Sequence, residues 1–183
     1  MVACNRGTKQ TAVVTTEETA SQTYFPVTDY LQGQIQELKQ SGINPVKISK
    51  TGNKVDSAWL KMEQLDSAFG IFLSPVIDTT NLKEFFTESK FHDKTINSYT
   101  FTYEPKVALP DSLMLRRWDV YVDPKSGNVK RIFMEKETSD KKTIKMSWTA
   151  GSGALVTWFN QDKQGNWILE KEEQYIWNFE EEQ

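Results

Sequence analysis

The sequence has a single cysteine, Cys4, and a single histidine, His92, among its 183 residues. One cysteine excludes an internal disulfide. A zinc site of the usual three or four Cys and His ligands cannot be assembled from one residue of each kind. A histidine-dependent nucleophile would have to be built on His92, which lies in a charged segment that we expect to be a surface loop. We therefore expect that the protein binds no metal and no cofactor. We also expect that it has no catalytic residue and is not an enzyme.

Charge of one sign and long apolar runs are also scarce. The net charge of −3 and the lack of a Lys/Arg run argue against a nucleic-acid partner. The longest apolar stretch, residues 68–73, is far shorter than the ~20 residues of a membrane span. Hydrophobic residues still make up 38% of the chain, with ten Phe and six Trp. That is enough apolar bulk for the core of one domain.

The surroundings of the cysteine are typical of a lipid-modified N-terminus. A lipobox places a small residue directly before the modified cysteine and an apolar residue three positions before it. Ala3 and Met1 occupy these positions. The charged and apolar regions of a signal peptide do not appear, so we expect them upstream of this start. We predict lipidation at Cys4; the alternative is a chance cysteine near a terminus.

A polar segment follows. Residues 5–23 are rich in threonine and carry almost no large apolar side chain, so they cannot bury enough surface to offset the cost of ordering. We predict that residues 1–23 are a lipobox remnant and flexible tether, and that residues 24–183 form a single α+β domain. Asn5 directly after the cysteine favours the outer membrane, with periplasmic and surface exposure both left open.

Helical spacing marks the start of the domain. Apolar residues recur at this spacing over residues 31–38, after Thr28 or Asp29 as a cap and before Gly42 as a terminator, which predicts a helix. Residues 62–72 also fit a helix, which Pro75 ends.

Two further segments are less uniform. Residues 46–50 and 55–59 alternate around a turn and predict a hairpin, with a helix from Asp56 as the alternative. Asp78 or Thr80 is placed to cap a short helix over residues 82–86.

From Thr95 onward the pattern changes to a period of two. The alternating segments, separated by short turns, are residues 99–103, 118–122, 132–134, 144–148, 155–159 and 167–179. Such spacing predicts a β-meander of about six strands. The fold class is therefore α+β, with N-terminal helices packed on a long, curled antiparallel sheet.

Three aromatic residues are out of phase with the main apolar set of their strands. Neighbouring side chains on a strand point to opposite faces, so Tyr121, Phe133 and Phe159 should lie on the face away from the helices. Aromatic side chains on that face either form a binding surface or are covered by a loop such as residues 106–111. We predict these three residues as a possible binding face.

Three glutamates interrupt the last predicted strand. Glu170, Glu172 and Glu173 fall between apolar positions of the strand that starts at Trp167. We interpret them as a bulge carrying a solvated acidic patch that protects a sheet edge. The alternative is a cation site or an acid/base site.

The lipobox, the tether, the first helix and the segment Tyr121-Val122-Asp123-Pro124-Lys125-Ser126-Gly127-Asn128-Val129 together resemble uncharacterised lipoproteins of bacteria with an outer membrane. That segment is also similar to a hairpin of small secreted PepSY-type modules. The first resemblance implies a cell-envelope location, and neither implies catalytic residues.

These observations favour a non-enzymatic, lipid-anchored envelope module that binds a protein or polymer partner through its sheet. One alternative is a carrier of an apolar ligand held between sheet and helices, which an enclosed apolar pocket would favour. Another is an envelope-polymer hydrolase, which a buried pair of carboxylates would favour. In each case the lipid anchor alone attaches the protein to a membrane.

Overall fold

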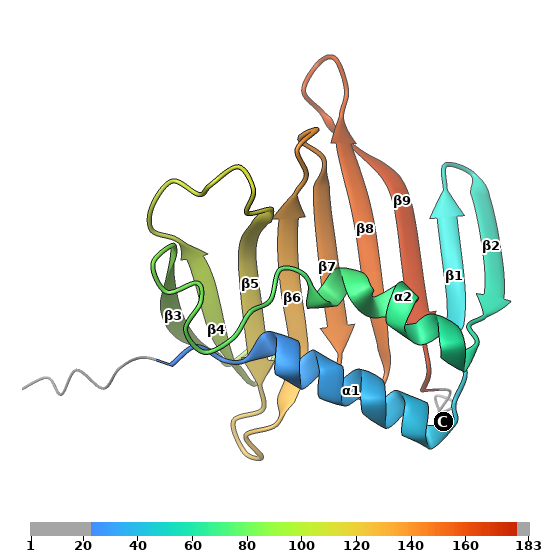
Figure 1. Cartoon of the computed structure of the whole chain (residues 1–183), viewed down its shortest axis with the longest axis horizontal. Helices are drawn as coiled ribbons and strands as arrows, with labels where there is room; N and C mark the ends of the chain where they lie inside the picture. The colour runs from blue at the N-terminus through green and yellow to red at the C-terminus, as the bar shows by residue number, and fades with distance from the viewer. Residues whose placement is uncertain (1–22, 179–183) are drawn as a thin grey trace, which may run out of the picture.

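A nine-stranded antiparallel sheet dominates the computed structural model, which describes residues 23–178 (Figure 1). The strand order is β2-β1-β9-β8-β7-β6-β5-β4-β3. Helices are few and short, so the chain is mainly β with helices on one face of the sheet. The predicted lipidation site Cys4 and residues 1–22 of the predicted tether lie outside the described residues.

Seven of the strands form the predicted meander, and two more form a hairpin that joins it. The strands are β1 (Val46–Thr51), β2 (Lys54–Trp59), β3 (Phe86–Asp93), β4 (Ser98–Pro105), β5 (Leu115–Val122), β6 (Val129–Glu137), β7 (Thr143–Thr149), β8 (Gly153–Gln161) and β9 (Trp167–Ile176). The prediction of about six strands was therefore wrong. The hairpin of β1 and β2 is confirmed, and β1 pairs with β9.

The predicted N-terminal helix is confirmed as α1 (Val27–Ser41). Its Leu31, Ile35 and Leu38 are buried in the core that it shares with the sheet. The helix ends at Gly42, which has a φ of 70°. This left-handed conformation suits glycine because glycine has no Cβ.

The predicted cap of α1 was wrong. The helix starts directly after Pro26, whose fixed φ suits a helix start, and no side chain caps it. The Thr28 hydroxyl instead accepts the backbone N–H of Ile77 at 2.7 Å, which ties the helix to the connection that leads to β3.

The second helical segment forms in three short pieces. They are η1 (Met62–Gln64), α2 (Leu65–Phe69) and η2 (Gly70–Leu73), so the helix predicted over residues 62–72 is confirmed in broken form. The alternative of a helix from Asp56 is wrong, because residues 54–59 form β2. Both α1 and α2 lie on the same side of the sheet (Figure 1). No helix in the described range has the length and apolar character that a membrane span needs.

The helix predicted over residues 82–86 was wrong as well. The Asp78 carboxylate does accept the N–H groups of Thr80 and Asn81, at 2.6 and 2.7 Å, but they form a turn. The chain then enters β3 at Phe86. His92 consequently lies exposed on β3, not in a loop, with its ring centroid 4.6 Å from that of Tyr99.

The core lies between the helices and one face of the sheet. On β7, Ile144, Met146 and Trp148 are buried while Lys145 is exposed, as the alternation predicted. The Trp148 ring contacts Phe69 of α2 with a centroid distance of 5.0 Å. One face of each central strand is thus fixed under the helical layer, and the other face is turned away from it.

Candidate functional site

The face of the sheet that points away from α1 and α2 is the candidate site, and we call it the open face (Figure 1). Residues paired across antiparallel strands share a face. Because Met146 and Trp148 point into the core, their neighbours Lys145, Ser147 and Thr149 belong to the open face. The register then assigns the residues of every other strand.

One row of residues crosses the open face from edge to edge. In sheet order its members are Trp59, Val46, Ile176, Gly153, Thr149, Arg131, Tyr121, Thr100 and Phe91. The two end residues are well exposed, Trp59 at 65% and Phe91 at 64%. At a strand spacing of ~4.8 Å the row is roughly 38 Å long. We call it the edge-to-edge row.

Gly153 makes a gap in the edge-to-edge row. A Cβ at this position would lie 2.6 Å from the backbone oxygen of Tyr175, so the strands β8 and β9 approach too closely for a side chain. A hollow of about 350 Å³ opens there, with Leu155, Gln174 and Ile176 in its lining. The glycine therefore shapes the open face as well as the pairing.

The three predicted binding residues all lie on the open face, and each is half-buried. Tyr121 belongs to the edge-to-edge row, and the Arg131 guanidinium lies 4.1 Å from its ring centroid. Phe133 lies in the next row, opposite Ser147. Phe159 stands apart, because a row of charges separates it from Phe133. The prediction of one face holds, but the three residues do not form a single patch.

The row that separates them alternates in charge. Its members are Lys50, Glu172, Thr157, Lys145, Glu135 and Arg117. Lys50 and Glu172 pair at 2.8 Å, and Lys145 and Glu135 at 3.9 Å. Opposite charges on neighbouring strands stabilise pairing modestly, and they leave this row polar without a strong net charge.

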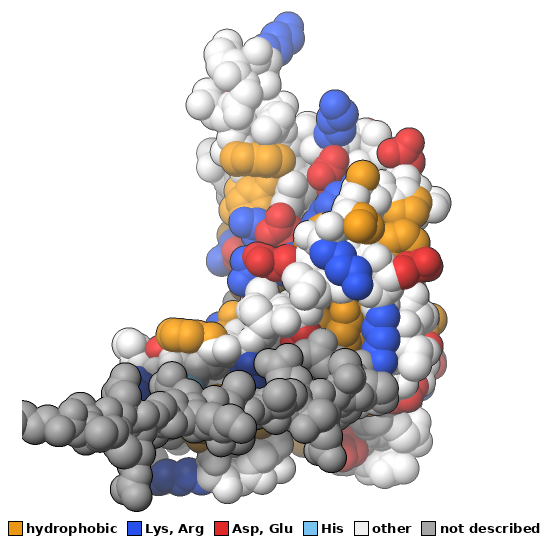
Figure 2. All heavy atoms as spheres, turned by 90° about the vertical axis from the view of Figure 1, so that its left-hand side faces the viewer, with side chains coloured by type: hydrophobic (Ala, Val, Ile, Leu, Met, Phe, Trp, Pro, Cys, Tyr) orange, Lys and Arg blue, Asp and Glu red, His pale blue; other side chains and the backbone are white. Residues whose placement is uncertain are grey.

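Phe159 borders a second hollow of the open face, of about 240 Å³. Trp167 and Lys145 also line it, and the Lys145 ammonium lies 5.6 Å from the Phe159 ring centroid. Figure 2 shows the β3 edge of the sheet, where hydrophobic side chains gather in small groups among charged ones. Aromatic side chains are enriched in the core of protein interfaces, and polar side chains form the rim.

The edge-to-edge row includes functional candidates that sequence reasoning missed. Phe91 was missed because β3 carries Phe86 on one face and Phe91 on the other, five positions apart, so no period of two appears. Gly153 falls between the predicted strands of residues 144–148 and 155–159, where the sequence predicts a turn. Only the approach of the neighbouring strand, which is a long-range contact, shows its role.

The interpretation of the three glutamates as edge protection was wrong, because β9 lies between β1 and β8 inside the sheet. The predicted bulge is present, as a register shift where β9 passes Trp158 and Phe159. Glu170 pairs with Lys142 at 2.9 Å, and Glu172 with Lys50 at 2.8 Å. Glu173 turns to the other face and is buried.

A buried lysine lies under the helical layer. The Lys136 side chain on β6 is almost wholly enclosed, and its ammonium donates to the backbone oxygens of Ile71 and Ser74. Burial lowers the pKa of Lys136 to about 8. Among the ion pairs of residues 23–178 none includes this lysine. We assign it the structural role of holding the end of η2 against the sheet.

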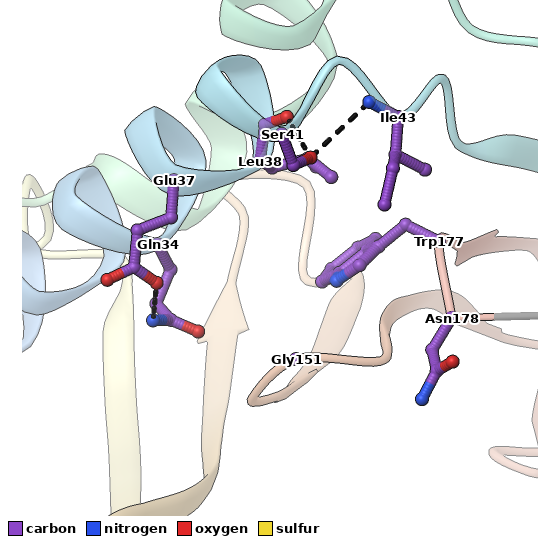
Figure 3. Close-up of a pocket in the computed structure, with 8 residues that line it drawn as sticks. All are labelled: Gln34, Glu37, Leu38, Ser41, Ile43, Gly151, Trp177 and Asn178. Carbon is purple, nitrogen blue, oxygen red and sulfur yellow. Dashed lines mark hydrogen bonds between the residues drawn. The ribbon is translucent and has the colours of Figure 1, made fainter. Parts of the chain in front are cut away.

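A further hollow, of about 330 Å³, lies where α1 ends beside the β7–β8 turn (Figure 3). Leu38, Ile43 and Trp177 supply its apolar lining. Its polar side chains are used locally: Ser41 donates to the Leu38 carbonyl at 2.7 Å, and Gln34 donates to Glu37 at 2.7 Å. Both of these hydrogen bonds lie within α1.

A hydrolase would need a buried pair of neighbouring carboxylates, and residues 23–178 contain no such pair. Their two buried carboxylates, Asp119 and Glu173, lie on β5 and β9 with three strands between them. Each is held by basic side chains, Asp119 by Arg117 at 3.2 Å. No group of three potential metal ligands occurs within residues 23–178.

Searches of protein families, of curated proteins and of solved structures find no match to this chain.

Proposed function

We propose that this protein is a lipid-anchored, non-enzymatic module of the bacterial cell envelope that binds a protein or polymer partner along the open face. The observation that carries the proposal is the edge-to-edge row, which spans nine strands and ends in exposed Trp59 and Phe91. The row carries apolar or aromatic side chains at both ends and at Tyr121, with Gly153 and polar residues between them, and a partner that lies across the strands would contact them in turn.

The shape of the open face supports a macromolecular partner over an enclosed ligand. Its two hollows, at Gly153 and at Phe159, both open to solvent. They lie on either side of the charged row, so a partner long enough to reach both would also meet Lys145 and Glu135. A small ligand would occupy only one of them.

The lipid anchor at Cys4 and the envelope location form the second part of the proposal. They rest on the lipobox pattern and the threonine-rich segment of residues 5–23. Stable attachment to a membrane needs more than one acyl chain, which a bacterial lipoprotein N-terminus supplies. The polar segment would then separate the sheet from the lipid headgroups.

One experiment tests both parts. The chain is expressed behind a lipoprotein signal peptide, membranes are sedimented, and the detergent-extracted protein is recovered with its bound partners. We expect Cys4→Ser to release the protein into the soluble fraction. Phe91→Glu combined with Tyr121→Glu should leave it on the membrane but lose the partners.

Gln36→Glu is the matched control, because Gln36 lies exposed on α1, on the other side of the sheet. This variant adds a negative charge on the helix side of the sheet. It should still sediment with the membranes and still be recovered with its partners. Cys4→Ser protein that sediments like the wild type would contradict the anchor. Partners retained equally by the double variant and by Gln36→Glu would contradict the open face.

A further inference from the structure

A hollow with charged side chains in its wall lies on the helix side of the sheet, and we call it the α2 groove. It has a volume of about 340 Å³ and lies between η1–α2 and the strands β1, β8 and β9. Small-molecule sites commonly have ~300–1,000 Å³. Lys47 and Glu173 supply charge to its lining, and Leu60, Ile71 and Trp158 supply apolar surface.

The charged end of the groove is built around Glu173, which is 8% exposed. The ammonium groups of Lys47 and Lys171 lie 2.7 and 2.8 Å from the same carboxylate oxygen, Oε1. The Tyr175 hydroxyl donates to the other oxygen at 2.7 Å. Two cations thus share one anion, and the cluster keeps one surplus positive charge.

The ionisation of this cluster is fixed around neutral pH. Burial raises the pKa of Glu173, but the hydrogen bonds from Lys171, Lys47 and Tyr175 outweigh it and lower the pKa to about 2. Burial and the bond to Glu173 raise the pKa of Tyr175. The carboxylate therefore stays ionised and the phenol stays neutral, so the surplus positive charge persists.

Donors for an incoming anion line the groove. A lysine ammonium has three N–H groups, and Lys47 gives one of them to Glu173. The Gln64 side chain accepts the backbone N–H of Lys61 through Oε1 at 2.9 Å, which leaves its amide N–H groups as donors. Ser67 adds a hydroxyl to the lining. A single surplus charge matches a monoanion better than a dianion.

The rest of the groove suits an apolar body. Trp158 is half-buried, and the Lys171 ammonium lies 4.9 Å from its ring centroid. Leu60 is buried in the wall, and Ile71 also belongs to the lining. Covering partly exposed apolar side chains stabilises a complex by about 25 cal/mol per Å² of apolar surface removed from water.

We propose that the α2 groove binds a monocarboxylate with a short apolar body, with the carboxylate at Lys47 and the body against Trp158, Leu60 and Ile71. This inference does not rest on the open face, since the two sites lie on opposite sides of the sheet. Loss of one would leave the other intact.

Calorimetric titration of the full chain with octanoate, octanamide and acetate tests the proposal. Octanoate should bind with a stoichiometry of one. Octanamide lacks the charge and acetate lacks the apolar body, so each should bind roughly tenfold more weakly or worse. Equal affinity for octanoate and octanamide, equal affinity for octanoate and acetate, or no saturable binding of octanoate would overturn the proposal.

Two lysine variants locate the site. Lys47→Gln should weaken octanoate binding roughly tenfold or more, while Lys171 and Tyr175 still hold Glu173. Lys54→Gln removes the same charge from the same hairpin, away from the lining, and should bind like the wild type. Equal effects of the two variants would overturn the proposal. If Lys47→Gln fails to fold, the affinities of the wild-type chain for octanoate, octanamide and acetate test the proposal without the variants.

Discussion

Replacing Trp148 by alanine should lower the free energy of unfolding by about 3–5 kcal/mol, as truncation of a buried tryptophan usually does. The side chain is 1% exposed. Its ring contacts Phe69, Phe72 and Trp177 at centroid distances of 5.0, 5.5 and 4.9 Å, so its removal leaves a cavity between the sheet and the helical layer. Urea unfolding followed by circular dichroism measures the loss.

Ser147 is the control, one residue earlier on the same strand and on the open face. Ser147→Ala should change the free energy of unfolding by at most about 0.5 kcal/mol, because it is a small change outside the core. Since a one-residue slip turns every side chain of a strand over, equal midpoints for the two variants would contradict the assignment of the faces.

Gly153→Ala should cost about 1–3 kcal/mol of stability, which is a large effect for one added methyl group. The new Cβ would lie 2.6 Å from the Tyr175 backbone oxygen, and a backbone atom of a paired strand cannot move aside without disturbing the pairing of β8 and β9. The thermal midpoint should fall, and hydrogen exchange should quicken in β9 first.

Gly70→Ala is the matched control. Gly70 has a φ of −55° in the helical region, and an added Cβ would meet nothing within 4 Å. Alanine at this position reduces the conformational freedom of the unfolded chain. The substitution should therefore be neutral or stabilise the fold by up to about 1 kcal/mol. If the two glycine variants have the same midpoint, the close approach at Gly153 does not restrict the fold as we describe.

Local patterns predicted much of the fold because one buried face gives each strand or helix a clear period. The alternation over residues 144–148 and the helical spacing over residues 31–38 both held. Where the two faces carry similar residues the period disappears, and β3 with Phe86 and Phe91 was missed for that reason. All six residues of β2 are exposed, so its assignment depended on the turn before it.

The candidate site was less predictable, because a surface across nine strands depends on register between distant segments. The sequence placed Tyr121, Phe133 and Phe159 on one face, but it could not show that a charged row separates Phe159 from the others. The position of β9 inside the sheet follows from its pairing with β1, more than a hundred residues earlier. No local pattern records that pairing.

Site-specific photo-cross-linking in cells tests the central claim, the use of the open face for binding, most directly. A benzophenone amino acid replaces Tyr121 or Phe133 on the open face, or Gln36 on α1, in the lipid-anchored chain. We predict discrete adducts from positions 121 and 133 and few from position 36, with the same adduct masses from both open-face positions. Adducts from position 36 alone, or equal yields from all three positions, would contradict the account.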